Sequence, residues 1–263
     1  MSTAEERRFL ATAEAAARAA GEHALRRFGQ TQQVALRSRN DVKLQIDSDC
    51  QAIAENVIRD AFPDHAVLGE EGGAPPLDAE HLWIVDPLDG TVNYFNGLPH
   101  WCSSVALHRR GECLAGAVYA PCLGDCFTAT RSGAAACNGA AIRVSKTDQL
   151  EHALVLTGVS AILADEEKRL ACFGRLLANT SKVRVLGAAA LDICFVAAGR
   201  ADALLEYALH LWDFAAGRLI LERAGGCYRP VLEVDALRSG CLCSNGRLDA
   251  SLYALLLDAI EGP

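Results

Sequence analysis

The spacing of hydrophobic and polar residues divides the chain into two stretches of different character. In the first stretch, apolar residues recur twice at helical spacing and then in short strand-like runs. Turn residues such as Pro121, Gly124 and Gly133 separate the later runs, which predicts an antiparallel meander. The helices are expected at about residues 3–28 and 49–61, and the strands at about residues 81–85, 104–108, 114–119 and 126–130.

After about residue 145, short apolar runs alternate with helical patterns. Gly199 and Gly225 follow two of these patterns and are typical C-terminal stops of helices. We therefore expect two packed halves that share one cleft, an α+β half over residues 1–145 and an α/β half over residues 146–263. The runs lie at about residues 154–156, 183–186 and 203–205, and the helices at about residues 166–177, 188–198 and 214–224.

Composition narrows the class of protein. The chain has 263 residues, 51% hydrophobic and 22% charged, which is typical of a globular protein and excludes a disordered tail or a collagen-like fibre. Its net charge of −8 argues against a nucleic-acid partner. Between Asp60 and His108 there are acidic residues but no Lys or Arg, so this segment holds the whole acidic excess. It is either a solvated loop or an acidic functional segment.

The eleven cysteines do not indicate disulfides. The first predicted helix has charged residues among its alanines and no apolar secretory stretch, and no later segment has the ~20 uncharged apolar residues of a membrane span. We therefore expect a cytoplasmic protein with reduced cysteines and no membrane partner. The pairs Cys122/Cys126 and Cys241/Cys243 lack the paired spacing of zinc ligands.

The segment WIVDPLDGT at residues 83–91 carries the most specific chemical signal. An apolar strand ends at Asp86, Pro87 cannot donate a ladder hydrogen bond, and Asp89 and Gly90 turn the chain before a helix can begin. Two carboxylates at a strand end would face nearly the same point and repel each other unless a cation lay between them. Oxygen ligands without His or Cys favour Mg²⁺. The alternative is an Asp-rich turn, since Asp-Gly is a common turn dipeptide.

Two further acidic segments bear on this choice. The segment GEEGG at residues 69–73 places Glu70 and Glu71 in a glycine-flanked bend, which by itself is typical of a loop. The segment WDFAAG at residues 212–217 places Asp213 where a helix begins, and the common role of an Asp there is an N-cap.

In combination, GEE, WIVDPLDGT and WDFAAG resemble the inositol monophosphatase family, and the resemblance extends from Asp41 to Gly226. It implies an α+β / α/β fold, the layered α-β-α-β-α sandwich of the inositol monophosphatase and fructose-1,6-bisphosphatase type. It further implies a Mg²⁺-dependent, lithium-sensitive hydrolase of phosphate monoesters that binds two or three ions and forms a homodimer.

The resemblance assigns a role to each matching position. Glu70 and Thr91 would orient and activate the attacking water, with Asp47 holding the threonine; from the sequence alone Asp47 is rather a cap of the second helix. Gly90 and Thr91 would offer backbone N–H groups to the phosphate at a helix N-terminus. The oxygen ligands of the metal ions would come from Glu70, Asp86, Leu88 (through its backbone carbonyl), Asp89 and Asp213.

The substrate side of the site follows from the same resemblance. Glu206 matches an acid that contacts ring hydroxyls in inositol phosphatases, and the alternative for it is an exposed charge at a strand end. His210 is expected to be structural rather than a ligand. The substrate-binding residues would be Gly90, Thr91, Gly187, Ala188, Ala189, Glu206 and Asp213.

The chain departs from the family pattern at several positions. Leu36 stands where the family has a lysine in a mobile loop, although Arg37 is adjacent. Lys43 introduces a base, Leu44 replaces a threonine, and Ala188 replaces a hydroxyl residue. Because that loop helps to place a metal ion in relatives, these departures indicate weaker metal affinity or a different substrate.

The favoured function is hydrolysis of inositol 1-phosphate, or a similar small phosphorylated polyol, by a metal-activated water without a phosphoenzyme. Alternatives within the same chemistry are histidinol phosphate, fructose bisphosphate and nucleoside 3′,5′-bisphosphates. A different class is a regulatory module that binds a protein partner. The complete set of acids with Thr91 favours catalysis, since folding alone would not demand all of them.

Overall fold

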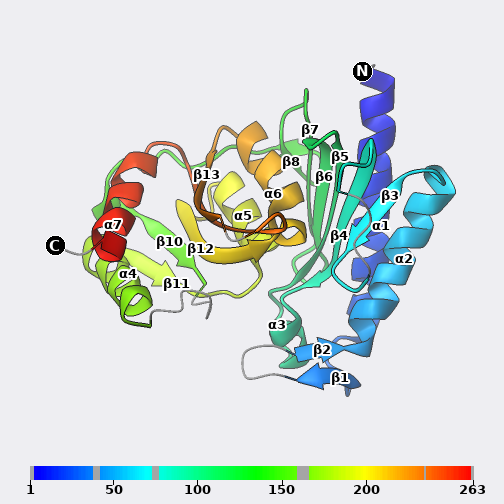
Figure 1. The fold of residues 1–263 in the computed structure, drawn as a ribbon, viewed down its shortest axis with the longest axis horizontal. Coiled ribbons are helices and arrows are strands. Elements are labelled where there is room, and N and C mark those ends of the chain that lie inside the picture. Colours follow the sequence, from blue (N-terminus) through cyan, green and yellow to red (C-terminus); the bar gives the residue numbers. More distant parts are fainter. Residues whose placement is uncertain (1–2, 38–41, 73–76, 159–165, 234, 262–263) are drawn as a thin grey trace.

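The computed structural model describes residues 3–37, 42–72, 77–158, 166–233 and 235–261. Asp41, where the family resemblance begins, lies outside these ranges. Two helices cover one face of a seven-stranded sheet, two lie between this sheet and a five-stranded sheet, and two cover the far side of the second sheet (Figure 1). The expected α-β-α-β-α sandwich is confirmed. In that order the helices are α1 (Thr3–Arg27) and α2 (Gln45–Ala61), α5 (Ala189–Ala197) and α6 (Leu211–Arg223), and α4 (Glu166–Asn179) and α7 (Asp249–Glu261).

The seven-stranded sheet has the strand order β3-β4-β5-β6-β7-β8-β9. From β4 onward each strand pairs antiparallel with the next, so the predicted meander is confirmed, whereas β3 pairs parallel with β4. The strands are β3 (Ala66–Gly69), β4 (His81–Asp89), β5 (Cys102–Arg109), β6 (Glu112–Ala120), β7 (Asp125–Thr130), β8 (Ala136–Cys137) and β9 (Ala140–Ala141).

The five-stranded sheet has the order β11-β10-β12-β14-β13, with β10 parallel to both of its neighbours and β14 antiparallel to both of its own. A separate antiparallel pair, β1 and β2, precedes α2. The division into halves at residue 145 stays a prediction. The strands are β10 (Leu154–Thr157), β11 (Lys182–Arg184), β12 (Ala203–His210), β13 (Cys227–Glu233), β14 (Arg238–Ser244), β1 (Val34–Arg37) and β2 (Val42–Leu44), and the short helices are α3 (Thr91–Phe95) and η1 (Leu150–His152).

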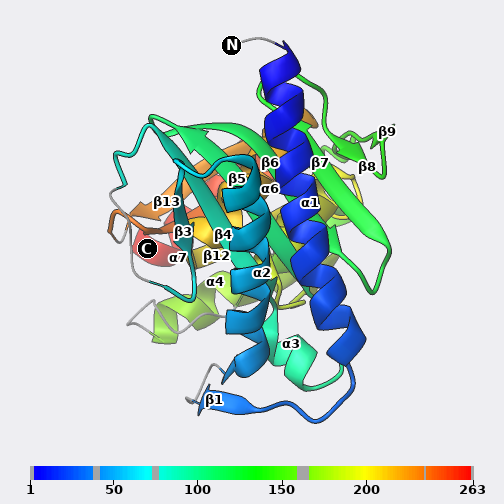
Figure 2. The same cartoon turned by 90° about the vertical axis from the view of Figure 1, so that its right-hand side faces the viewer.

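Helix α1 lies beside α2 across the seven-stranded sheet (Figure 2). Its buried face consists mostly of alanines, among them Ala13, Ala17 and Ala24, which lets the helix backbone come close to the strands. At Gly21 even a Cβ atom would lie 2.7 Å from Cδ1 of Tyr119 on β6. The small residues of this helix therefore serve close packing. None of the helices in the described ranges is both long and apolar enough to cross a membrane.

Several predicted boundaries near the acidic segments are wrong. Strand β4 continues past Pro87, because its pairing with β5 is irregular between Asp86 and Asp89 and so does not need the missing donor. Helix α2 begins at Gln45 rather than Asp49, and the carboxylate of Asp47 in its first turn accepts the N–H of Leu44 at 2.7 Å. The sequence reasoning also missed strands and a helix that lack a clear local pattern: β1, β2, β3, β8, β9, β13, β14 and α7.

Candidate active site

The predicted metal-binding acids come from the ends of three elements. Asp86 and Asp89 lie in the last part of strand β4, which ends at Asp89 just before α3. Because β3 runs parallel to β4, with Gly69 opposite Val85, Glu70 follows β3 next to Asp86, and its N–H donates to the Val85 carbonyl at 3.2 Å. The third element is α6, which carries Asp213 in its first turn.

These carboxyl groups are buried close enough to repel one another. Asp86 is only 2% exposed, and burial, followed by the charges of Glu70, Asp89 and Asp213, holds its pKa well above the usual range. Burial and the charge of Asp89 likewise raise the pKa of Asp213, which shares a side-chain hydrogen bond with Asp86. Such a bond needs a proton on one of the two carboxyls. A bound cation would remove this need.

Asp89 has a structural role that the sequence did not reveal. Its carboxylate accepts the backbone N–H groups of Ala189 at 3.1 Å and Ala190 at 2.8 Å, at the start of α5. The N-cap residue of α5, Ala188, has no side-chain acceptor, so Asp89 caps the helix from a distant part of the chain. Burial and the nearby charge of Asp192 raise the pKa of Asp89 to about 6.

Thr91 lies beside the acids and next to Asp47. Its hydroxyl donates to the Leu88 carbonyl at 2.9 Å and lies 3.5 Å from Oδ1 of Asp47. The sequence-predicted pair of Asp47 and Thr91 is therefore brought together. Gly90, between Asp89 and Thr91, has a φ of +89°, and a Cβ there would be 3.0 Å from the carbonyl oxygen of His100. The turn thus requires glycine.

Glu206 is a buried acid in the middle of β12, so the alternative of an exposed charge at a strand end is wrong. Burial, with the charges of Asp192, Asp213 and Asp89, raises its pKa to about 8. A side chain at Gly158 would overlap its carboxylate, so the glycine leaves room for the carboxylate in this position.

The loop predicted to line the substrate lies against the turn predicted to bind metal. Asn93 of α3 donates to the Leu186 carbonyl at 2.7 Å and to the His100 carbonyl at 2.8 Å, which holds Gly187 and Ala188 near Gly90. Sequence reasoning missed Asn93. Asp192, one turn further along α5, is 1% exposed and contacts His100 Nε2 at 2.8 Å. It was missed too, because an isolated Asp in a helical pattern gives no signal.

Lys43, Arg37 and Leu36, which lie where the chain departs from the family pattern, make different contacts. Lys43 contacts the acidic bend, with Nζ 2.5 Å from Oε1 of Glu71 and 3.7 Å from Oε1 of Glu70. Arg37 instead places its guanidinium 5.7 Å from the ring centroid of Phe95. Leu36 is exposed on β1.

His210 stands at the N-cap of α6. Its backbone N–H donates to Oδ2 of Asp213 at 2.8 Å, and its ring stacks on Trp212 with 4.7 Å between centroids. These contacts orient Asp213. The structural role of the His210 ring stays a prediction.

The donor set fits Mg²⁺ by its chemistry. Glu70, Asp86, Asp89 and Asp213 offer carboxylate oxygens, and Leu88 offers its carbonyl, which here accepts the Thr91 hydroxyl. Within the described residues no three His, Cys, Asp or Glu side chains already stand in a metal-holding arrangement, since Asp89 and Asp213 are turned to backbone N–H groups. The fit rests on hard oxygen donors and on charges that repel one another without a cation.

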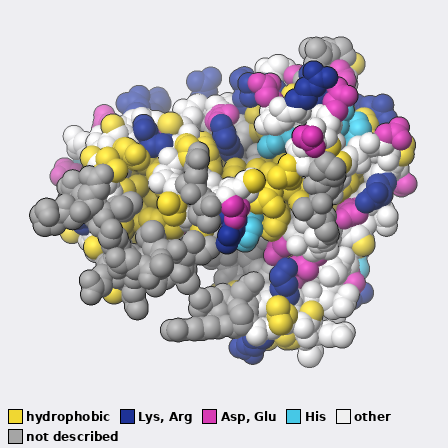
Figure 3. Space-filling model, in the orientation of Figure 1, with side chains coloured by type: hydrophobic (Ala, Val, Ile, Leu, Met, Phe, Trp, Pro, Cys, Tyr) yellow, Lys and Arg dark blue, Asp and Glu magenta, His cyan; other side chains and the backbone are white. Residues whose placement is uncertain are grey.

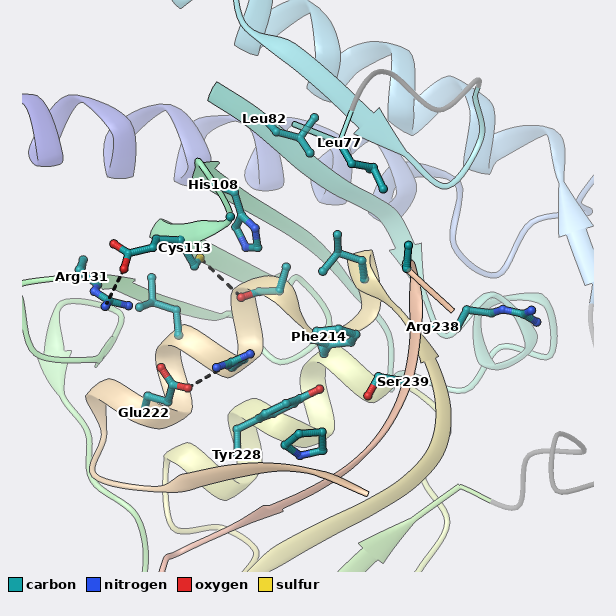
Figure 4. Close-up of a pocket in the computed structure, with 18 of the residues that line it drawn as sticks. Leu77, Leu82, His108, Cys113, Arg131, Phe214, Glu222, Tyr228, Arg238 and Ser239 are labelled. Carbon is teal, nitrogen blue, oxygen red and sulfur yellow. Dashed lines mark hydrogen bonds and ion pairs between the residues drawn. The ribbon is translucent and has the colours of Figure 1, made fainter. Parts of the chain in front are cut away.

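A cavity of about 660 Å³ is lined by residues other than these acids. Figure 4 shows Leu82 and His108 on one side of it and Phe214 and Tyr228 on the other. In the middle of the face that Figure 1 presents, hydrophobic side chains gather with charged ones around them (Figure 3). The charged residues that line the cavity are paired, so it offers no ready site for a phosphate. The pairs are Arg131–Glu112 (3.6 Å), Arg218–Glu222 (2.8 Å) and Arg238–Asp235 (2.7 Å).

Comparison with known proteins identifies relatives of this chain. The profile of the inositol monophosphatase family matches residues 5–261. An inositol-1-monophosphatase of Rhizobium meliloti is 38% identical over 211 residues, 79% of this chain and 79% of the relative. A protein of Xylella fastidiosa named Nus factor SuhB is 38% identical over 228 residues, 85% of this chain and 82% of the relative.

A solved structure gives the same result. The IMPase of Thermotoga maritima matches with a TM-score of 0.86 and 31% identity, covering 96% of this chain and 98% of that one. The sequence profile, the relatives and the shared fold lead to one conclusion. The chain belongs to the inositol monophosphatase family.

Proposed function

We propose that this protein hydrolyses phosphate monoesters of small polyols, with inositol 1-phosphate as the favoured substrate and Mg²⁺ as the cofactor. The observation that carries the proposal is the burial of Asp86 and Asp213 against Glu70 and Asp89, beside the pair of Thr91 and Asp47. The repulsion among these carboxylates opposes folding, whereas a site for divalent cations needs them close together. The family uses Mg²⁺.

The protein groups around the acids suit attack by water. Mg²⁺, held by Glu70, Asp86, Asp89, Asp213 and the Leu88 carbonyl, would neutralise charge on the attacking and leaving oxygens of the phosphate. Because the Thr91 hydroxyl directs its proton to Leu88 or Asp47, its free lone pair can accept a hydrogen bond from a water. Glu70 would accept the second proton of that water. In this arrangement the two residues would orient the water for direct attack on the phosphate, without a phosphoenzyme.

The substrate would be held from two sides. The N–H groups of Gly90 and Thr91 are proposed to contact the phosphate, because they lie at the start of α3 directly after Asp89. Glu206 is proposed to contact a ring hydroxyl. With a pKa of about 8, its carboxyl carries a proton at neutral pH in the metal-free protein and can donate a hydrogen bond as well as accept one.

Substrate profiling of the purified protein with and without Mg²⁺ tests the proposal. We expect Mg²⁺-dependent release of phosphate from inositol 1-phosphate at a higher rate than from histidinol phosphate, fructose 1,6-bisphosphate or a nucleoside 3′,5′-bisphosphate. Equal, feeble rates on all four would contradict the substrate assignment.

A single hydroxyl tests the mechanism. Thr91→Val should lower kcat by about 100-fold, a typical effect of losing a positioned catalytic group. Thr180→Val is a matched control, because the Thr180 hydroxyl also donates to a backbone carbonyl, that of Leu176 at 2.7 Å, but at the end of α4. If both variants kept the wild-type rate, Thr91 would have no role in the reaction.

A second candidate function is binding of a protein partner. The observation that favours it is the name Nus factor, which the Xylella fastidiosa relative carries. A pull-down that captured a stoichiometric partner, together with purified protein inert toward phosphate monoesters, would favour this function over catalysis.

We further propose a homodimer in a reducing cytoplasm. The cysteines support this location, since all eleven are free thiols. Light scattering of the purified protein would test the dimer.

A further inference from the structure

Lys43 brings a positive charge to the acidic bend. Its Nζ lies 2.5 Å from Oε1 of Glu71 and 3.7 Å from Oε1 of Glu70, and about one third of the Lys43 side chain is exposed (34%). Lys43 pairs with Leu36 across β1 and β2, and the N–H of the next residue, Leu44, is held by Asp47. The strand that carries the ammonium group is therefore tied to the same residue that contacts Thr91.

The acidic bend is held at least as firmly. The Glu70 N–H donates to the Val85 carbonyl at 3.2 Å, and the Glu71 N–H donates to Oε1 of Gln51 at 2.7 Å. A side chain at Gly69 would overlap Gln51, so the bend is also packed against α2. The backbone on both sides of the contact is therefore fixed, so only the side chains can move apart.

We propose that Lys43 is a built-in cation that competes with a divalent metal ion for Glu70 and so lowers the affinity of the ion that Glu70 helps to bind. The inference rests on the proposed function, because Glu70 is a metal ligand only there. Glu70 repels Asp86 and Asp213 when no metal is bound. The Lys43 charge offsets part of that repulsion and repels an arriving cation.

The stabilisation of the metal-free protein by Lys43 and the loss of metal affinity are linked. If Lys43 stabilises the metal-free arrangement, binding of an ion at Glu70 must weaken the contact of Lys43 with Glu70 by the same free energy. Because the pair is partly exposed and screened by solvent, the effect on metal affinity is moderate. We expect about 10-fold, which corresponds to about 1.4 kcal/mol.

The test uses Mn²⁺ as the probe, with binding measured by calorimetry and by the electron paramagnetic resonance of free Mn²⁺. Lys43→Gln removes the charge, Lys43→Met keeps only the apolar stem, and Lys43→Arg keeps the charge. Lys182→Gln removes an exposed lysine from β11, in the five-stranded sheet, as a matched control. Both neutral variants should bind one Mn²⁺ ion, the one that Glu70 helps to hold, about 10-fold more tightly than wild type. Without metal they should melt at a lower temperature. The Lys43→Arg and Lys182→Gln variants should match wild type.

Equal Mn²⁺ affinity in wild type and in whichever neutral variant folds would overturn the inference and leave the proposed function standing. A gain in affinity for Lys43→Arg as large as for Lys43→Gln would also overturn it, since shape and not charge would then be responsible. Wild-type protein that bound no Mn²⁺ at all would overturn both this inference and the proposed function.

Discussion

Replacing Asp89 by Asn separates the catalytic and structural roles of one carboxylate. The two oxygens of Asp89 accept the N–H groups of Ala189 and Ala190 at 3.1 and 2.8 Å. Asn has one carbonyl oxygen, so the variant keeps part of the α5 cap and loses about 1 kcal/mol of stability from the weakened bonds.

Removing the charge of Asp89 should stabilise the metal-free protein, which opposes the loss from the weakened cap. Burial and the charge of Asp192 raise the pKa of Asp89 from 3.8 to about 6. At about 1.4 kcal/mol per pH unit, this opposes folding of the metal-free protein by about 3 kcal/mol. A carboxyl whose pKa is raised by folding destabilises only once it ionises in the unfolded chain, so the penalty is absent below pH 3.8 and complete above about pH 6.

The two magnitudes give a definite expectation. Without metal, Asp89→Asn should be more stable than wild type by about 2 kcal/mol at pH 7, and this gain should vanish near pH 4. Turnover should nevertheless fall by about 100- to 1,000-fold, because a metal ligand is lost. Urea unfolding at both pH values and initial-rate assays with Mg²⁺ measure the two quantities.

The matched control is Asp202→Asn. Asp202 is also buried and accepts the Leu154 N–H at 2.7 Å and the Ser145 hydroxyl at 2.6 Å, but it lies at the start of β12, away from the proposed ligands. It should lose about 1–2 kcal/mol and keep its turnover. Near-normal hydrolysis by Asp89→Asn would refute its role as a ligand, and a loss of stability at pH 7 equal to that of Asp202→Asn would refute the electrostatic reasoning.

Two further predictions concern the turn and the substrate side. Gly90→Ala should destabilise the fold by roughly 2–3 kcal/mol, because it combines a φ of +89° with a contact of 3.0 Å to the His100 carbonyl. The control Gly124→Ala, at φ +69° in open space, should cost only about 1 kcal/mol. Urea unfolding measures both losses, and equal losses would show that the close contact is harmless. Glu206→Gln should gain stability over wild type in metal-free buffer as pH rises from 4.5 to about 8, by up to about 5 kcal/mol, because the raised pKa of Glu206 disfavours folding once the unfolded chain ionises. Melting temperatures across this range measure the gain, and a difference that did not change with pH would contradict it.

The sequence by itself determined those parts of the protein whose signal is local. Helix α1 and the strands of the meander were predicted because hydrophobic periodicity and turn residues act over a few neighbouring positions. Asp86, Asp89 and Thr91 were identified as a group because one short segment carries all three. The start of α2 was predicted too late, because Asp47 caps it from inside the first turn and not from the position before it.

Only the tertiary structure decided how these residues affect one another. The cap that Asp89 provides to α5 joins residues about a hundred positions apart, and Asp192 and Lys43 reach the acids from other elements. The register of β3 on β4 puts Glu70 beside Asp86, and the length of β12 buries Glu206. The pKa of a carboxyl and the partners of an ammonium group depend on distance and on loss of solvent. Both quantities arise from packing between distant segments, and no window of neighbouring residues contains them.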